Sequence, residues 1–198
     1  AIIKDNYLPV LIMELRKLGI DGKDFGWGKK DEAMVTKDLL KDEQVFAYNL
    51  ADLYRRQGNN KKMIEYYLNS VEANPSRMAS VKTLFQRYLV EEDFLDLQAQ
   101  LYERIQEKRD IPIYPELLSW VFIQRKDYKN ALRQVRAMDK RLKENGGRVY
   151  QLAQTAYRDK DYETAIKAYD YIVTSKGERN TYYLESKREI LKCKRFQL

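Results

Sequence analysis

The feature that most constrains the fold is a period of 34 residues. Leucine recurs at this interval four times, at Leu50, Leu84, Leu118 and Leu152. A second column, ten residues after each leucine, is aromatic in its last three members, Phe94, Tyr128 and Tyr162. A unit of this length cannot bury an apolar face alone, so neighbouring units must stack and share a continuous core. The sequence therefore predicts an array of repeats.

Each repeat has the spacing of two helices joined by a short turn. Apolar residues recur three, four and seven positions apart, as in Tyr162, Ala165 and Tyr169, which is typical of one helix face. An Asp or Asn precedes the second column in every repeat, where it favours a turn or a helix N-cap. Pro75 and Gly146 interrupt the pattern between repeats. We therefore predict an all-α fold.

The composition excludes several kinds of site. The chain has no histidine and a single cysteine, Cys193, which excludes an internal disulfide, a Cys/His zinc site and a histidine-activated nucleophile. The sequence also lacks a glycine-rich phosphate loop and a cluster of metal ligands. We therefore expect no enzymatic activity, no catalytic residue, no cofactor and no metal.

The charge and hydropathy patterns limit the classes of partner that we expect. The chain carries 37 basic and 30 acidic residues, a formal net charge of +7 that favours acidic partners. No apolar run approaches the roughly 18–20 residues that a membrane-spanning helix needs. We expect no membrane span.

Two segments carry a family resemblance, AYNLADLYRRQGNNKKMIEYYLNSVEANP (47–75) and residues 149–172. Their order of Leu, small residue, Tyr, Asp-Tyr, Ala, Tyr and Pro resembles the tetratricopeptide repeat. The resemblance covers residues 44–179 and implies a right-handed α–α superhelix of helix-turn-helix repeats. The chain also resembles repeat proteins that some bacteria export, which leaves its compartment open between the bacterial cytoplasm and an exported or periplasmic location.

The repeat phase predicts three parts. Residues 1–43 are expected to form an irregular helix pair, whose glycine-rich loop IDGKDFGWG packs on the first repeat or contacts a partner or a preceding repeat. Four repeats are expected at 44–77, 78–111, 112–145 and 146–179. Residues 180–198 are expected to form a basic capping helix.

The resemblance also implies a binding surface, because the first helices of such repeats line the inner side of the array. The predicted partner-binding positions are Tyr48, Asp52, Arg55, Lys82, Gln86, Trp120, Gln124, Tyr150, Gln154, Tyr157 and Arg158. Their aromatic, amide and basic side chains are typical of protein contacts. We expect a non-enzymatic scaffold whose concave groove binds a peptide or helix of another protein, with an acidic or extended segment. The alternative is a basic groove that binds nucleic acid or an acidic surface, although the inner positions share no base-reading scheme.

Overall fold

A computed structural model describes residues 47–197, apart from the side chain of Leu53, and these residues form nine α-helices and no strand. The all-α fold expected of stacked helical repeats is confirmed. The predicted helix pair and loop of residues 1–43 lie outside the described residues. The described part of the chain divides into two compact units, the first ending at Arg87 and the second beginning at Tyr88.

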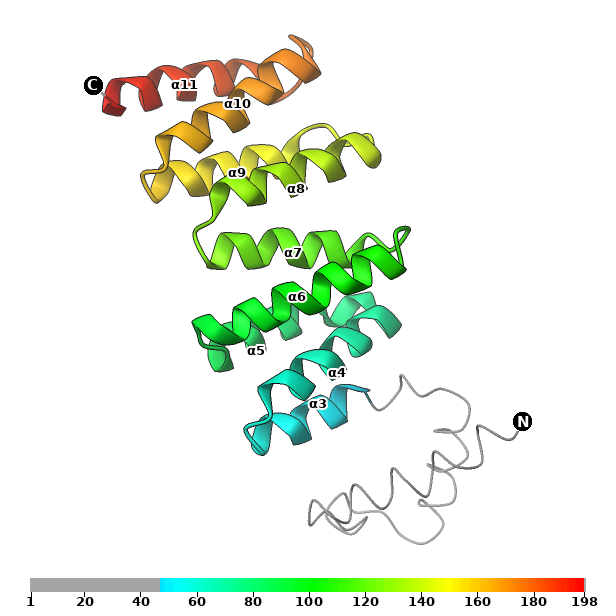
Figure 1. Ribbon diagram of the computed structural model, residues 1–198. Coiled ribbons are helices and arrows are strands. Elements are labelled where there is room, and N and C mark those ends of the chain that lie inside the picture. The colour runs from blue at the N-terminus through cyan, green and yellow to red at the C-terminus, as the bar shows by residue number, and fades with distance from the viewer. Residues whose placement is uncertain (1–46, 198) are drawn as a thin grey trace, which may run out of the picture. The chain divides into compact units, whose positions relative to one another are not determined.

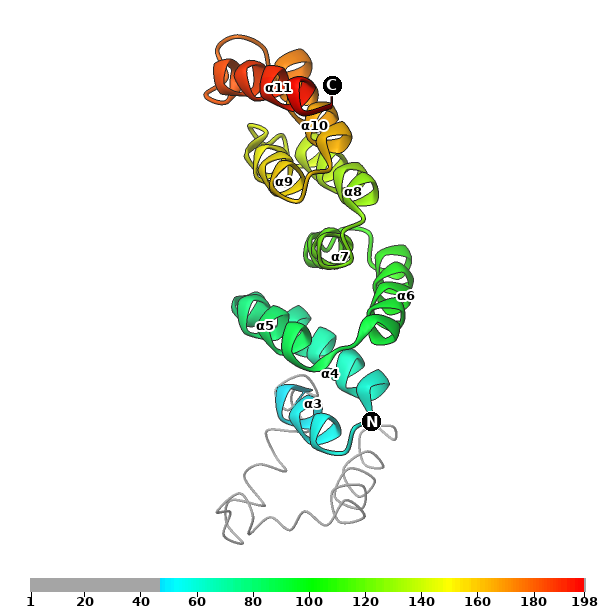
Figure 2. The ribbon, with the colours of Figure 1, turned by 90° about the vertical axis from the view of Figure 1, so that its left-hand side faces the viewer.

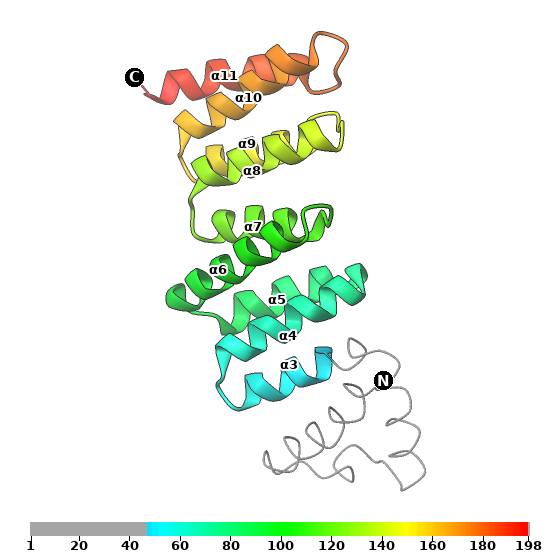
Figure 3. The ribbon, with the colours of Figure 1, turned by 45° about the vertical axis from the view of Figure 1, so that its right-hand side comes forward.

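The first unit contains a helix pair followed by one more helix. Its elements are α3 (Ala47–Arg56), α4 (Asn60–Ala73), the short 3-10 helix η2 (Pro75–Arg77) and α5 (Met78–Tyr88). Figure 3 shows α3, α4 and α5 in succession. Tyr67 of α4 and Phe85 of α5 are fully buried and meet edge to face, with 5.9 Å between ring centroids. This aromatic contact joins α4 to α5.

The second unit is a stack of consecutive antiparallel helices (Figure 1). They are α6 (Glu91–Glu107), α7 (Ile113–Gln124), α8 (Tyr128–Arg141), α9 (Gly147–Arg158), α10 (Tyr162–Lys176) and α11 (Tyr183–Gln197). Each helix packs on the next along the chain, and α8 also contacts α10. Within this unit, Figure 2 shows α7, α9 and α11 in one layer and α6, α8 and α10 in the other.

Small residues let the helices of the last pair approach closely. Ala153 and Ala156 of α9 are fully buried, as are Ala165 and Ala168 of α10, which packs against it. The larger Tyr169 beside them is 1 % exposed. Burial of such a large side chain contributes roughly 1.5–3 kcal/mol. The periodic positions identified in the sequence therefore form the core of this pair.

Three of the turns between paired helices share one backbone geometry. The residue before the N-cap adopts a left-handed conformation at Gly58, Lys126 and Lys160, with φ of 72°, 57° and 67°. Asn59, Asp127 and Asp161 then cap α4, α8 and α10, each side chain accepting a hydrogen bond from a backbone N–H three residues later. The predicted turn and N-cap role is confirmed at these three positions.

The equivalent Asp93 does not cap α6, and that prediction is wrong. α6 begins at Glu91 with Val90 as its N-cap, and the Asp93 carboxylate accepts a hydrogen bond from the Val90 N–H at 3.0 Å. Glu91, Glu92 and Asp93 place three negative charges at the positive end of the helix dipole, which favours an early start.

Among residues 47–197, no helix combines the length and the apolar composition that crossing a bilayer requires.

Candidate functional site

The eleven predicted binding residues divide between the two units. Five lie on α3 and α5 in the first unit, and six lie on α7 and α9 in the second. In the second unit these residues occupy the layer formed by α7, α9 and α11 in Figure 2. We call the six residues Trp120, Gln124, Tyr150, Gln154, Tyr157 and Arg158 the first-helix face. None of the six is fully buried.

In the first unit, charged residues of α3 pair with one another. Asp52 accepts hydrogen bonds from Arg55 at 2.6 Å and from Arg56 at 3.0 Å. Because both guanidiniums belong to the same helix, this carboxylate is neutralised within α3. On α5, Lys82 is half-buried and Gln86 is exposed.

Tyr48 of α3 is anchored by aromatic and cationic neighbours. Its ring meets Tyr67 edge-on at 5.3 Å between centroids, and the Arg77 guanidinium lies 5.4 Å from its ring. Burial, and then the charge of Asp52, raise the pKa of Tyr67 to about 12. Tyr48 is thus a fixed, half-buried side chain.

In the second unit, Trp120 projects from a helix that is apolar on nearly every side. α7 lies between α6 and α8, and Leu117, Leu118 and Val121 are fully buried. Trp120 remains half-buried, with its ring centroid 6.1 Å from that of Phe94 on α6. One side of the indole is therefore packed within the protein while part of it stays accessible.

Tyr157 has a comparable arrangement near the end of α9. Its ring meets Tyr162 of α10 at 5.7 Å and Phe196 of α11 at 6.3 Å, both edge to face. The neighbouring Gln154 and Arg158 are exposed. The end of α9 thus presents a half-buried aromatic ring beside an accessible amide and an accessible cation.

Tyr150, at the other end of α9, is more strongly packed. It stacks on Tyr182 at 4.8 Å and meets Tyr169 edge-on at 5.6 Å. Burial, and then the charge of Glu185, raise the pKa of Tyr150. Its hydroxyl therefore stays protonated at neutral pH and can donate a hydrogen bond, but it is unsuited to act as a base.

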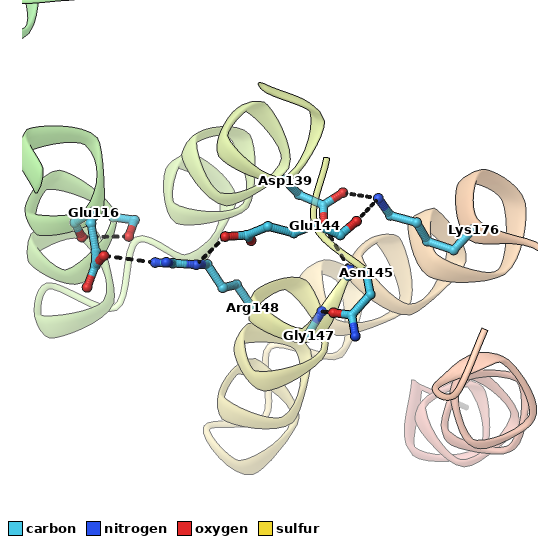
Figure 4. Close-up of polar contacts among 9 residues, drawn as sticks. Glu116, Asp139, Glu144, Asn145, Gly147, Arg148 and Lys176 are labelled. Atoms are coloured by element: carbon cyan, nitrogen blue, oxygen red, sulfur yellow. Dashed lines mark hydrogen bonds and ion pairs between the residues drawn. The ribbon is translucent and has the colours of Figure 1, made fainter. Parts of the chain in front are cut away.

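An ion-pair chain fixes α9 relative to α7 (Figure 4). Arg148 donates to Glu116 of α7 at 3.0 Å and to Glu144, in the α8–α9 turn, at 2.9 Å. The hydrogen bond to Glu116 is the main cause that raises the pKa of Arg148. This bridge links the two helices that carry the first-helix face.

A buried carboxylate, Asp139, holds the same turn from the side of Lys176 (Figure 4). Asp139 is fully buried and accepts hydrogen bonds from the Gly146 N–H at 2.8 Å and from the Tyr171 hydroxyl at 2.7 Å. Lys176 lies 2.5 Å from Asp139 and also donates to the Glu144 carbonyl. Burial, and then the bond to Asp139, raise the pKa of Tyr171 to about 12.

Two exposed leucines of α11 were missed from the sequence. Leu184 and Leu191 are 77 % and 69 % exposed, and they follow Tyr150 and Tyr157 by 34 residues. Extending the period into residues 180–198 would have found them. Asp139 could not be found in this way, because the 34-residue period places it in a column that is otherwise apolar, with Val71, Ile105 and Val173.

The comparisons with known proteins agree with this architecture. A model of the family described as tetratricopeptide repeat matches residues 46–77, which include α3, α4 and η2. None of the curated proteins matches the chain. Repeats of this family generally act as modules of protein–protein interaction. Residues 46–77 thus match a tetratricopeptide repeat, and the all-helical structure of the described residues is consistent with a solenoid of such repeats.

Proposed function

We propose that the first-helix face binds an extended or helical segment of a partner protein, without catalysis. The observation that supports this most directly is the packing of Trp120 and Tyr157. Each is half-buried and is held on one side by aromatic rings of neighbouring helices. An aromatic side chain that is already held in place loses little conformational entropy on binding, which makes it an effective anchor.

The polar residues of the same face suit a peptide. Gln154 is exposed and Gln124 is half-buried, and an amide side chain can donate to a peptide carbonyl and accept from a peptide N–H. The exposed Arg158 favours an acidic side chain in the partner. The formal charge of +7 acts in the same direction at longer range.

In this proposal the repeats run over 44–77, 78–111, 112–145 and 146–179, and residues 180–198 cap the array. The predicted residues of the first unit, Tyr48, Asp52, Arg55, Lys82 and Gln86, would contribute a second surface. Of these, the anchored Tyr48 is the counterpart of Trp120 and Tyr157.

Site-specific cross-linking tests the location of the surface. A photoactivatable side chain at Gln154, exposed on α9, should cross-link to a partner in extract of the native cell. The same group at Ser175, exposed on α10 in the other layer, is the matched control and should capture little of that partner. Cross-linking from Ser175 alone would place the interaction on the opposite layer and refute the proposal.

Alanine substitution then tests the anchors. Trp120→Ala with Tyr157→Ala should lower the retention of the cross-linked partner by at least about tenfold, because two anchors of this kind dominate binding energy. Leu142→Ala, which removes a 44 % exposed leucine after α8, should leave retention unchanged. Equal retention by all variants would exclude Trp120 and Tyr157 as anchors.

A further inference from the structure

The outer sides of α6 and α8 carry opposite charge. α6 contains six acidic residues and one basic residue, whereas α8 contains five basic residues and one acidic residue. The acidic residue of α8 is Asp139, which is buried in the network described above. Both helices belong to the same layer of the second unit and run in the same direction (Figures 1 and 2).

On α6, acidic and apolar residues share one exposed stripe. We define the acidic stripe as Glu92, Leu95, Asp96, Tyr102 and Glu103, all exposed and spaced for one helix face. Leu95 and Tyr102 are 50 % and 39 % exposed. The carboxylates of Glu92, Asp96 and Glu103 form no ion pair among the described residues.

On α8, the corresponding side is uniformly basic. We define the basic stripe as Lys129, Arg133, Arg136 and Lys140, all exposed and spaced by four, three and four residues. None of the four forms an ion pair within residues 47–197. Arg136 lies 4.7 Å from the Tyr171 ring, and Lys129 is one of the charges that lower the pKa of Glu163, after Lys167.

We propose that a second copy of this chain docks here, with the acidic stripe of each copy on the basic stripe of the other. A two-fold axis parallel to the helices, between α6 and α8, would form both contacts at once, as an isologous interface requires. The long Lys and Arg stems can cover Leu95 and Tyr102 while their charged groups reach the carboxylates. An acidic partner of another kind would oppose α6 with like charge, so a copy of the chain fits the surface better.

Salt provides the first test, because exposed charge pairs are screened. Sedimentation velocity over a wide range of protein concentration should show a monomer–dimer equilibrium at about 50 mM salt that shifts to monomer at about 1 M, where the Debye length is about 3 Å. A chain that stays monomeric at low salt and high protein concentration would refute the proposal. Binding of an oligonucleotide by that monomer would reassign the basic stripe to nucleic acid.

Charge reversal provides the sharper test. The variant Lys129→Glu, Arg133→Glu and Lys140→Glu should be monomeric, since its two stripes are then both acidic. The variant Glu92→Lys, Asp96→Lys and Glu103→Lys should be monomeric, since its two stripes are then both basic. An equimolar mixture of the two should dimerise, because each basic stripe then meets an acidic one, and one chain carrying all six changes should dimerise with itself.

The matched control changes the same amount of charge elsewhere. The variant Lys187→Glu, Lys194→Glu and Arg195→Glu, with all three positions exposed on α11, should dimerise like the natural chain. Unchanged circular dichroism would show that every variant keeps its helices. Failure of the mixture to dimerise, with both single-stripe variants folded, would refute the paired stripes, as would persistence of the dimer in either variant alone.

Discussion

The helices α10 and α6 occupy the same place in the 34-residue period, yet they begin differently. α10 starts at Tyr162, after Lys160 in the left-handed conformation and Asp161 as N-cap. α6 starts at Glu91, three residues earlier in the period, and neither Leu89 nor Val90, which link it to α5, has a positive φ. The two helices also differ at one recurring core position, which is Ala165 in α10 and Leu97 in α6.

The comparison shows that the period specifies the core but not the turn. Ala165 and Leu97 are both fully buried, so the recurring apolar position is kept despite the change of size. The start of the helix follows local electrostatics instead. Consecutive acidic residues at 91–93 favour the first helical turn, whereas a single Asp preceded by Lys leaves room for a left-handed residue and a cap.

The largest expected effect comes from exchanging the core residues. Leu97→Ala should lower the free energy of unfolding by about 2–5 kcal/mol, since it opens a cavity. Ala165→Leu should lower it by about 1–3 kcal/mol, since the larger side chain must fit between α9 and α10. Urea unfolding followed by circular dichroism measures both. Ala137→Leu, exposed on α8, is the control and should change stability little.

An unchanged free energy of unfolding in Ala165→Leu would contradict the close packing of α9 on α10. An unchanged free energy of unfolding in Leu97→Ala would show that α6 can move to fill the cavity.

The fold could be predicted because its main determinants are periodic. Leu118, Leu152, Ala131 and Ala165 are buried at the positions that the 34-residue spacing assigns to the core. Each residue alone has only a weak preference for helix or for burial. Because the same apolar positions recur in four repeats, the pattern as a whole predicts the helices. The N-cap prediction for Asp93 is wrong because the residue at which a helix begins depends on its immediate neighbours, and these differ between repeats.

A smaller effect is expected from removing the polar residue at each turn. Asp161→Ala should lower the free energy of unfolding by about 1 kcal/mol, because the Thr164 N–H loses its acceptor. Asp93→Ala should cost less, about 0.5 kcal/mol or below, because the Val90 N–H that it satisfies is exposed and can bond to water. Chemical denaturation of the two variants in parallel measures the difference. Equal losses would mean that Asp93 caps α6 as strongly as Asp161 caps α10.

The candidate site was less predictable than the fold. The exposed positions of Gln154 and Arg158 follow from helix phase, and the accessible leucines of α11 follow once the period is extended. The network of Asp139, Tyr171 and Lys176 does not, because it depends on side chains of two helices, α8 and α10, that meet only in the folded chain. The period would place an apolar residue at position 139, as it does at Val71, Ile105 and Val173.

The smallest expected effect is that of a glycine substitution, which should stabilise the turn before α10 and destabilise the start of α6. Lys160 has φ of 67°, a conformation that costs an L-residue with a side chain roughly 1 kcal/mol relative to glycine. Lys160→Gly should therefore raise the free energy of unfolding by several tenths of a kcal/mol, after the greater entropy of glycine in the unfolded chain is subtracted. Glu92→Gly should lower it by about 0.5–1 kcal/mol, because residue 92 is helical. Both are measured in dilute protein, where association does not contribute.

The first turn supplies a natural control for this sign change. Gly58 occupies the position equivalent to Lys160, with φ of 72°, and a Cβ added there would meet no atom within 4 Å. Gly58→Ala therefore isolates the backbone conformation from crowding and should destabilise the chain by about 1 kcal/mol. If Gly58→Ala and Lys160→Gly shift stability in the same direction, the left-handed residue is not what distinguishes these turns from the start of α6. Opposite shifts would assign the difference to that one dihedral angle.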